Sequence, residues 1–227
     1  MANAEKVSTS LKGFTGYVSP TTDTTIVNND AFIASLKTEN GVVATGETGY
    51  SKAVDTRQKH FSKETTSVSK LLSPIVAAVQ AKLGKKAKEV TDLKALVAKI
   101  RGIKPKKIQP STTPTPVVAD TVSQSVSSYG SITQTFADII ASLVALGANY
   151  APVKTELKLA ALQTKLTDIT ASNNAVTTTF NSLQTAIDAR LILYATLTER
   201  TQRIKEAVKS QYGVTSTEYK LIKGLKV

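Results

Sequence analysis

Residues 152–212 read PVKTELKLAALQTKLTDITASNNAVTTTFNSLQTAIDARLILYATLTERTQRIKEAVKSQY, in which apolar side chains recur at alternating steps of three and four. A strand alternates every two residues and cannot give this spacing, whereas a helix gathers such positions on one stripe. At ~1.5 Å per residue, about sixty helical residues would measure roughly 90 Å. We therefore predict an all-α, elongated bundle of long antiparallel, coiled-coil-like helices. The stripe comprises Leu159, Leu162, Leu166, Ile169, Asn173, Val176, Phe180, Leu183, Ile187, Arg190, Tyr194, Leu197, Thr201, Ile204 and Val208.

Asn173 is the polar residue at the centre of this stripe, and two interpretations of it are open. A buried Asn at a seam position fixes the register of some coiled coils. Alternatively, Ala-Ser-Asn-Asn at 171–174 is a turn that divides the stretch into two helices. Because the stripe keeps its phase across 171–174, we expect one helix. The seam positions other than Arg190 and Thr201 form a candidate self-association surface, which another chain or other helices of the same chain could cover.

The composition excludes several kinds of chemistry. The 227 residues include no Cys and one His, so disulfides and thiol catalysis are excluded, and a zinc site would have to combine His60 with carboxylates alone. No glycine pattern matches a dinucleotide-binding or phosphate-binding loop, and the carboxylates are too sparse for a paired acid–base site. We therefore expect a protein that is not an enzyme and that holds no metal or cofactor.

Ser and Thr together make up 52 of the 227 residues. Thr loses side-chain freedom in a helix, so its abundance indicates helices that are held by packing and not by intrinsic propensity. These residues also give a surface of low charge that could pack against copies of itself. Compositional drift is the alternative explanation.

Residues 1–50 are the first predicted segment, an irregular N-terminal arm with one short helix. Asp30 can cap a helix over 31–39, which Asn40-Gly41 would end through a left-handed residue. We expect residues 41–49 to form a loop.

Residues 51–102 are the second segment, a basic helical hairpin. Apolar spacing predicts a helix over about 51–83, in which Pro74 removes one backbone donor and should kink or split the helix. A turn at Gly84 leads to another helix over about 86–101.

Residues 103–119 are the third segment, a Pro-rich crossover or linker, whose four prolines forbid a helix and favour extended chain. Residues 120–212 are the fourth, a long helical hairpin. Asp120 can cap its first helix, over about 120–148.

Gly-Ala-Asn at 147–149 should end this first helix and form the joint of the hairpin, and Pro152 suits the first turn of the long helix. Residues 213–227 are the last segment, a short helix and tail. A glycine ends the long helix there, and Thr215 and Glu218 have the spacing of a capping box.

The end of the chain carries a resemblance. From Ile204 to Lys226 it reads IKEAVKSQYGVTSTEYKLIKGLK, with a basic helix, a Tyr-Gly break, Ser-x-Glu-Tyr and a short basic end. This stretch resembles the tail of uncharacterised bacterial helical proteins of similar length. The resemblance covers about a tenth of the chain and implies a bacterial helical bundle without an assigned activity.

The net charge of +12 is concentrated in residues 51–109, which hold fifteen Lys or Arg against four acids. Such a patch could bind the phosphates of nucleic acid, an anionic scaffold or an acidic protein, or it could be a solvated face. Lys lacks the bidentate fork of Arg, and no aromatic residue between Phe61 and Tyr129 is present to stack on bases. The candidate anion-binding patch comprises Lys82, Lys85, Lys86, Lys88, Lys104, Lys106 and Lys107.

Residues 136–153 form an apolar run. A helical hairpin with an apolar tip resembles the architecture of helical pore-forming toxins. The run contains a Gly, a charge and a Pro and falls short of the ~20 apolar residues of a spanning helix, so we expect a buried helix end. The chain does not open on a basic and then apolar leader. We expect a cytoplasmic protein, with leaderless export left open.

These observations favour a structural role, in which a helical subunit self-associates or packs on a partner protein through its heptad stripes. The first alternative is a basic accessory protein that binds nucleic acid or an anionic scaffold. The second is a helical membrane-active protein of the pore-forming kind.

Overall fold

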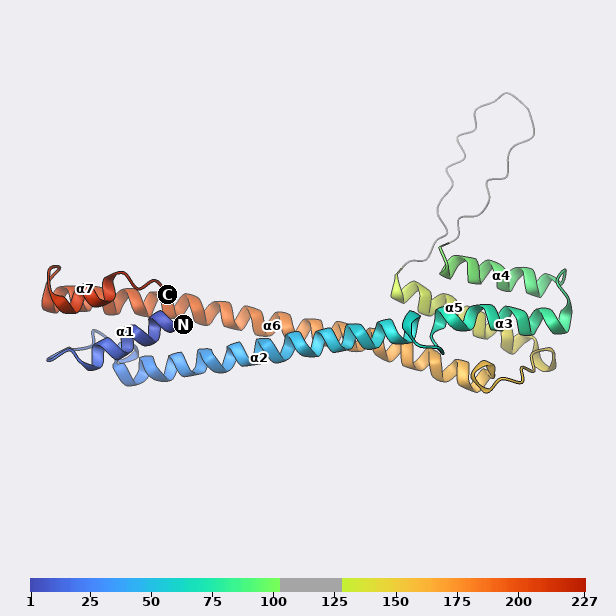
Figure 1. Ribbon diagram of the computed structural model, residues 1–227, viewed down its shortest axis with the longest axis horizontal. Coiled ribbons are helices and arrows are strands. Elements are labelled where there is room, and N and C mark those ends of the chain that lie inside the picture. Colours follow the sequence, from blue (N-terminus) through green and yellow to red (C-terminus); the bar gives the residue numbers. More distant parts are fainter. Residues whose placement is uncertain (103–127) are drawn as a thin grey trace, which may run out of the picture. The chain divides into compact units, whose positions relative to one another are not determined.

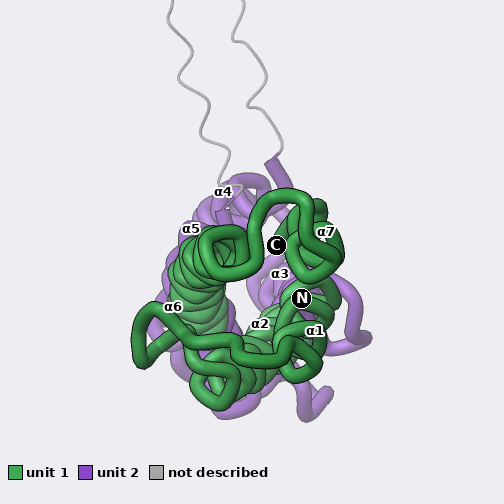
Figure 2. The backbone as a smooth tube through the Cα atoms, turned by 90° about the vertical axis from the view of Figure 1, so that its left-hand side faces the viewer, with its two compact units in different colours: residues 1–50, 179–227 green, residues 51–178 purple. Residues whose placement is uncertain are grey.

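The computed structural model describes residues 1–102 and 128–227, and in these ranges the chain forms helices and turns with no β-strand. The all-α class predicted from the sequence is confirmed. Two compact units divide the chain, unit 1 with residues 1–50 and 179–227 and unit 2 with residues 51–178 (Figure 2). The predicted crossover, the start of the predicted fourth helix, and Lys104, Lys106 and Lys107 lie outside the described residues.

The long stripe forms a single helix, α6 (Leu159–Tyr212), as expected, and no turn interrupts it at 171–174. The start at Pro152 is wrong, because residues 155–157 form a separate 3-10 turn and Lys158 is extended. The C-terminal end is confirmed at Gly213, whose φ of 91° lies in the left-handed region that glycine tolerates best.

The prediction of an irregular N-terminal arm is wrong, because helix α1 (Ala2–Lys12) occupies its beginning. Ala4, Val7 and Leu11 are buried at steps of three and four, which places them on one helical face. This face is short and lies among Ser and Thr, so the sequence signal is weak. In unit 1, α1 packs against α7 (Thr217–Lys223) (Figure 1).

The predicted short helix and loop before residue 50 are also wrong, because α2 (Ile26–Gln58) runs unbroken through Asn40-Gly41. Its buried residues in unit 1 include Ile33, Leu36 and Val43, again at helical spacing. Each interior glycine costs roughly 1 kcal/mol of helix stability relative to Ala. Packing of this apolar face compensates for that cost.

The core of unit 1 consists of two neighbouring apolar clusters. Leu197 of α6 is buried with residues of α1 and α2, and Ile204 and Val208 are buried with α1 and with Ile222 of α7. The cap of α7 is Ser216, whose Oγ accepts a hydrogen bond from the Tyr219 backbone N–H at 3.1 Å. The capping box predicted one residue earlier is therefore wrong, although the short helix itself is confirmed.

Unit 2 is built around one apolar cluster, to which α3 (Val68–Leu83), α4 (Lys88–Ile100), α5 (Tyr129–Ala145) and the first turns of α6 contribute. Figure 1 shows α3 and α4 side by side, joined by a short turn, so the predicted hairpin is confirmed. The residues of this hairpin that the cluster buries include Leu72, Ile75, Val79, Val90, Leu93 and Val97.

The predicted helix over 51–83 is divided at a different place from the one expected. A π-helix at Lys59–Lys63 ends α2, and α3 begins only at Val68, whereas α3 is continuous through Pro74. Proline removes one backbone hydrogen bond, and burial of the residues on either side of it, including Leu72 and Ile75, keeps the helix together.

Helix α5 begins at Tyr129, where Ser128 has extended backbone and its Oγ accepts a hydrogen bond from Ser131 N–H at 3.1 Å. The predicted break is confirmed by a 3-10 turn at Gly147–Asn149. Phe136 and Leu143 of the apolar run are completely buried in the core of unit 2, as expected for a buried helix end. In the described ranges, no helix combines the length and the apolar character needed to cross a membrane.

Candidate interaction surfaces

The first part of the α6 stripe is covered by this chain itself. Leu162 and Ile169 are completely buried in the core of unit 2, and Leu159 and Leu166 pack against the same core. Asn173 is half-buried, and its Nδ2 donates a hydrogen bond to Thr133 Oγ1 of α5 at 3.1 Å. These seam positions therefore have partners within unit 2.

The last part of the stripe is covered in the same way within unit 1. Leu197, Ile204 and Val208 have no exposed surface. Tyr194 is half-buried, and its hydroxyl accepts a hydrogen bond from Asn40 Nδ2 of α2 at 3.2 Å. This end of the stripe therefore belongs to the core of unit 1.

The middle of the stripe is covered less completely. Val176 is buried in unit 2 and Leu183 of unit 1 is half-buried against Gly46 of α2. Phe180 contacts Tyr50 of α2, with ring centroids 5.7 Å apart, and is nevertheless 48% exposed. The stripe thus remains open to solvent over part of unit 1.

Phe180, Ile187 and Leu191 form what we call the α6 edge. Steps of seven and four residues place the three side chains on the same side of the helix. Ile187 is half-buried and Leu191 is 59% exposed. The predicted stripe does not include Leu191, because it continues from Ile187 to Arg190. Leu191 is four residues after Ile187, a helical spacing that is visible in the sequence. Ile192, 66% exposed, points to another side of the helix, because consecutive residues turn by ~100°.

The chain around the α6 edge has few charges. Residues 169–187 of α6 contain no charged side chain. The exposed face of a surface helix usually carries Lys and Glu, whereas here it carries Thr, Ser, Asn and Gln. Near Phe180 the edge therefore has an uncharged margin, which can approach another protein surface without desolvating charges. Asp188 and Arg190 lie between Ile187 and Leu191 at its other end.

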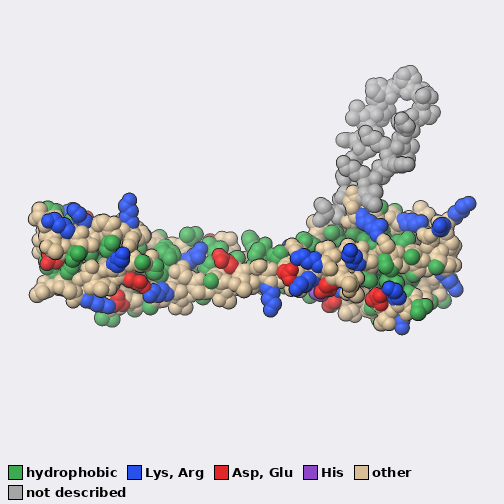
Figure 3. Space-filling model, viewed as in Figure 1, with side chains coloured by type: hydrophobic (Ala, Val, Ile, Leu, Met, Phe, Trp, Pro, Cys, Tyr) green, Lys and Arg blue, Asp and Glu red, His purple; other side chains and the backbone are tan. Residues whose placement is uncertain are grey.

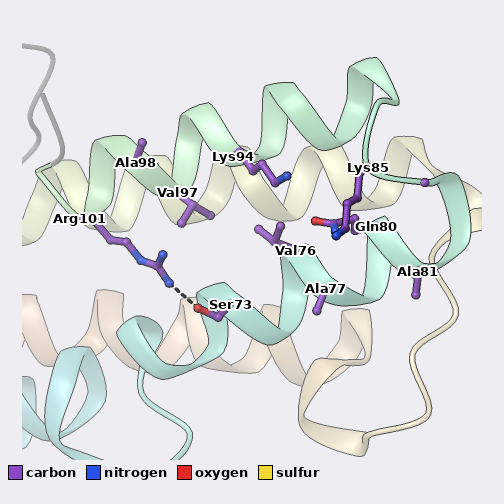
Figure 4. Close-up of a pocket in the computed structure, with 11 residues that line it drawn as sticks. Ser73, Val76, Ala77, Gln80, Ala81, Lys85, Lys94, Val97, Ala98 and Arg101 are labelled. Atoms are coloured by element: carbon purple, nitrogen blue, oxygen red, sulfur yellow. Dashed lines mark hydrogen bonds between the residues drawn. The ribbon is translucent and has the colours of Figure 1, made fainter. Parts of the chain in front are cut away.

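A second surface is a groove of about 730 Å³ between α3 and α4 in unit 2. Figure 4 shows Val76 of α3 and Val97 of α4 pointing toward one another across it. Small side chains line much of the remainder, which keeps the groove open. The lining consists of Ser73, Val76, Ala77, Gln80, Ala81, Gly84, Lys85, Lys94, Val97, Ala98 and Arg101.

The charges in this basic groove are all of one sign. Lys85, Lys94 and Arg101 line it, and its lining includes no carboxylate. Arg101 Nη2 donates a hydrogen bond to Ser73 Oγ at 2.5 Å, which holds the guanidinium at one end of the groove (Figure 4). Lys and Arg side chains also gather over this part of unit 2 in the space-filling view (Figure 3).

The predicted anion-binding patch only partly coincides with this groove. Lys85 lines it, while Lys82, Lys86 and Lys88 are exposed and do not. Lys88 forms an ion pair with Asp92 at 2.6 Å. Lys94 and Arg101 belong to the basic segment 51–109 but not to the predicted patch, although their separation of seven residues places them on one face of a helix. A search for cations on one face would have found them.

His60 lies in a polar cluster and not in a recognisable catalytic arrangement. Its Nδ1 is 3.6 Å from Glu64 Oε2 and 3.4 Å from Lys165 Nζ. Lys165 Nζ is also 3.6 Å from Glu64 Oε2, and its side chain is only 11% exposed. The described residues contain no cluster of three His, Cys, Asp or Glu side chains that could hold a metal ion.

The comparisons with known proteins add no further assignment. No protein-family model, no curated protein and no solved structure matches the chain.

Proposed function

We propose that the protein is a non-enzymatic, self-associating helical subunit, two copies of which pack their α6 edges together. The observation that carries this proposal is the partial exposure of Phe180 and Leu191, at 48% and 59%, on one side of a helix whose stripe the chain covers at its first and last parts. The role is structural, and the cytoplasmic location expected from the sequence is part of the proposal.

Charge supports a second copy as the partner. Copies of a chain with a net charge of +12 repel one another over most of their surface. The uncharged stretch 169–187 gives no such repulsion. The part of the α6 edge from Phe180 to Ile187 is therefore a place where two copies can meet at low electrostatic cost.

The intrinsic weakness of the helices supports the same partner. Thr177, Thr178 and Thr179 precede Phe180 in α6, and three consecutive β-branched residues are poor helix formers. Gly41 and Gly49 lie in the part of α2 that belongs to unit 1, and they lower the stability of that helix. Helices of this kind depend on packing for their stability, and a second copy would add packing at the open edge.

The size of the edge sets the expected affinity. Phe180 and Leu191 are eleven residues apart, which is about 16 Å along a helix. Two copies related by a twofold axis would bring the same three side chains together, as isologous dimers do. The surface area that three apolar side chains bury over this length is smaller than the roughly 800 Å² per partner of a standard interface. We therefore expect a dissociation constant on the order of micromolar or weaker.

Sedimentation velocity of the full chain over a wide concentration range tests the proposal. We expect the mass to rise from that of a 24.1 kDa monomer toward twice that value as the concentration increases. A Phe180→Ser chain should remain monomeric at the highest concentration at which the native chain is dimeric. A native chain that stays monomeric into the millimolar range would contradict the proposal.

The membrane-active alternative is not taken further, because Phe136 and Leu143 of the apolar run lie in the core of unit 2. The alternative of a basic binding protein retains support from the groove between α3 and α4, which is a separate surface.

A further inference from the structure

We infer that the basic groove between α3 and α4 binds an acidic amphipathic helix of a partner protein. This inference does not depend on self-association, since the groove lies in unit 2 and the α6 edge in unit 1.

The shape of the groove fits a helix. Two antiparallel helices leave a furrow between their outer faces, and a third helix can lie in it with its side chains between theirs. Ala77, Ala81 and Ala98 line the furrow. Small side chains allow the close approach of helix axes, whereas longer ones would fill the groove. Val76 and Val97 supply apolar contact at its floor.

The length of the groove also fits a helix of a few turns. Its lining on α3 begins at Ser73 and extends to Ala81, and along α4 it runs from Lys94 to the C-cap residue Arg101. At ~1.5 Å per residue, each wall is about 10 to 12 Å long. A partner helix of about three turns would span it and meet Lys85 beyond the end of α3.

The charges select the partner's chemistry. Lys94 of α4 and Arg101, the C-cap residue of that helix with helical backbone, lie seven residues apart. Carboxylates at a spacing of about seven on a partner helix would therefore meet both. None of the salt bridges found among the described residues involves Lys85, Lys94 or Arg101. Their charges are therefore available to a carboxylate from outside. The apolar floor requires Ala or Leu on the same face of that helix.

The same features disfavour nucleic acid as the occupant. The lining includes no aromatic residue for stacking on bases. Phosphate groups could bind the exposed lysines around the groove as well as those that line it. Val76 and Val97 would make no favourable contact with phosphates. If nucleic acid is the occupant, the affinity should depend on all the lysines in and around the groove. If an acidic helix is the occupant, the affinity should depend mainly on the residues that line the groove.

Fluorescence anisotropy with a defined peptide tests the inference. The probe is a labelled synthetic helix of about 14 residues, or four turns, with Glu at spacings of seven on one edge of an Ala and Leu face. A peptide with Lys in place of each Glu is its control. We expect the acidic peptide to bind the full chain with a dissociation constant on the order of 10 μM and the basic peptide not to bind.

Three variants locate the binding. The double variant Lys94→Glu with Arg101→Glu should weaken binding at least about tenfold, which corresponds to roughly 1.4 kcal/mol. Lys82→Glu makes the same kind of charge change on α3 outside the groove and should weaken binding less than about threefold, as expected for a screened distant charge. Ala81→Glu adds a carboxylate to the groove at an exposed helical position and should likewise weaken binding at least about tenfold. This variant tests the inference independently if the double variant fails to fold.

Three outcomes would overturn the inference. The first is no binding of the acidic peptide by the native chain. The second is an equal loss of affinity with Lys82→Glu and with the groove variants, which would indicate a diffuse positive field. The third is displacement of the peptide by duplex DNA or RNA, together with an equal loss of nucleic-acid affinity in all the charge variants. This result would indicate a nucleic-acid-binding surface.

Discussion

Gly46 of α2 lies directly against Leu183 of α6, and a Cβ atom at position 46 would come within 3.2 Å of Leu183 Cδ1. The contact joins the two longest helices within unit 1. It explains why a glycine is accommodated in the middle of α2, since a larger residue would have to displace the leucine. The contact also lies close in sequence to the α6 edge at Phe180.

The three glycines of α2 allow a prediction with internal controls. A Cβ at Gly41 or Gly49 would have no atom within 4 Å, so Gly41→Ala and Gly49→Ala should each raise the free energy of unfolding by about 0.5 to 1 kcal/mol. Gly46→Ala should raise the free energy of unfolding by clearly less, because Leu183 must move to make room for the new Cβ atom. Urea unfolding followed by circular dichroism measures all three. An equal gain at Gly46 would contradict the close contact.

Asn173 is predicted to be a weak point of unit 2. Its Oδ1 is buried without a hydrogen-bond partner, while Thr133 Oγ1, which accepts from its Nδ2, also donates to the Tyr129 carbonyl at 2.8 Å. Asn173→Leu removes an unpaired polar atom and leaves Thr133 bonded, so it should raise the free energy of unfolding by about 1 kcal/mol. Asn174→Leu, at the exposed neighbouring position, serves as the control and should have little effect. A loss of stability in Asn173→Leu would indicate that the amide specifies the packing.

Tyr150 should make unit 2 sensitive to alkaline pH. Burial raises the pKa of its hydroxyl from 10.0 to about 12, and this hydroxyl donates a hydrogen bond to the Leu157 carbonyl at 2.7 Å. Because the folded pKa is the higher one, the stabilisation is complete below pH 10 and is lost as the pH rises toward 12.

Tyr150→Phe tests this dependence. The variant should lose about 1 kcal/mol of stability near neutral pH, because the Leu157 carbonyl loses its donor. The difference between native and variant chains should then shrink above pH 10, since the variant has no hydroxyl to ionise. Urea unfolding at a series of pH values gives this difference. Parallel pH profiles would contradict the assignment.

Asp23 should contribute to the acid sensitivity of unit 1. Hydrogen bonds from Thr21 and Arg203 lower the pKa of its carboxyl below 3.8, and Arg200 Nε lies 3.6 Å from its Oδ2. Because the folded pKa is the lower one, this stabilisation is complete above the unfolded pKa and is lost as the pH falls through the folded value. Asp23→Asn should therefore lower the stability at neutral pH and flatten its decline below pH 4. Thermal unfolding at acidic and neutral pH would show it, and an unchanged acid profile would contradict it.

The sequence predicted the elements that carry a strong apolar period and missed those that depend on tertiary contact. The α6 helix follows from its uninterrupted stripe and was predicted as a single helix. The α2 helix was missed because Gly41, Gly46 and Gly49 have low helix propensity, and the packing that compensates for them comes from α6, far away in the sequence. The helix α3 is likewise continuous through Pro74, because burial of the residues on either side of the proline holds it together.

The candidate surfaces were predictable only in part. Charge density identified Lys85, but a groove also requires small residues such as Ala77 and Ala81, which carry no chemical signal in a sequence. The stripe identified Phe180 and Ile187, but only the structure distinguishes the seam positions that the chain covers from those that it leaves open.

The comparison of Leu191→Glu with Ile192→Glu by light scattering tests the central claim, self-association through the α6 edge, most directly. The two side chains are 59% and 66% exposed and adjacent in sequence, and they differ in the side of α6 on which they lie. At a concentration where the native chain is dimeric, the account predicts that Leu191→Glu scatters as a 24.1 kDa monomer and that Ile192→Glu remains dimeric. Equal masses for the two variants would contradict it.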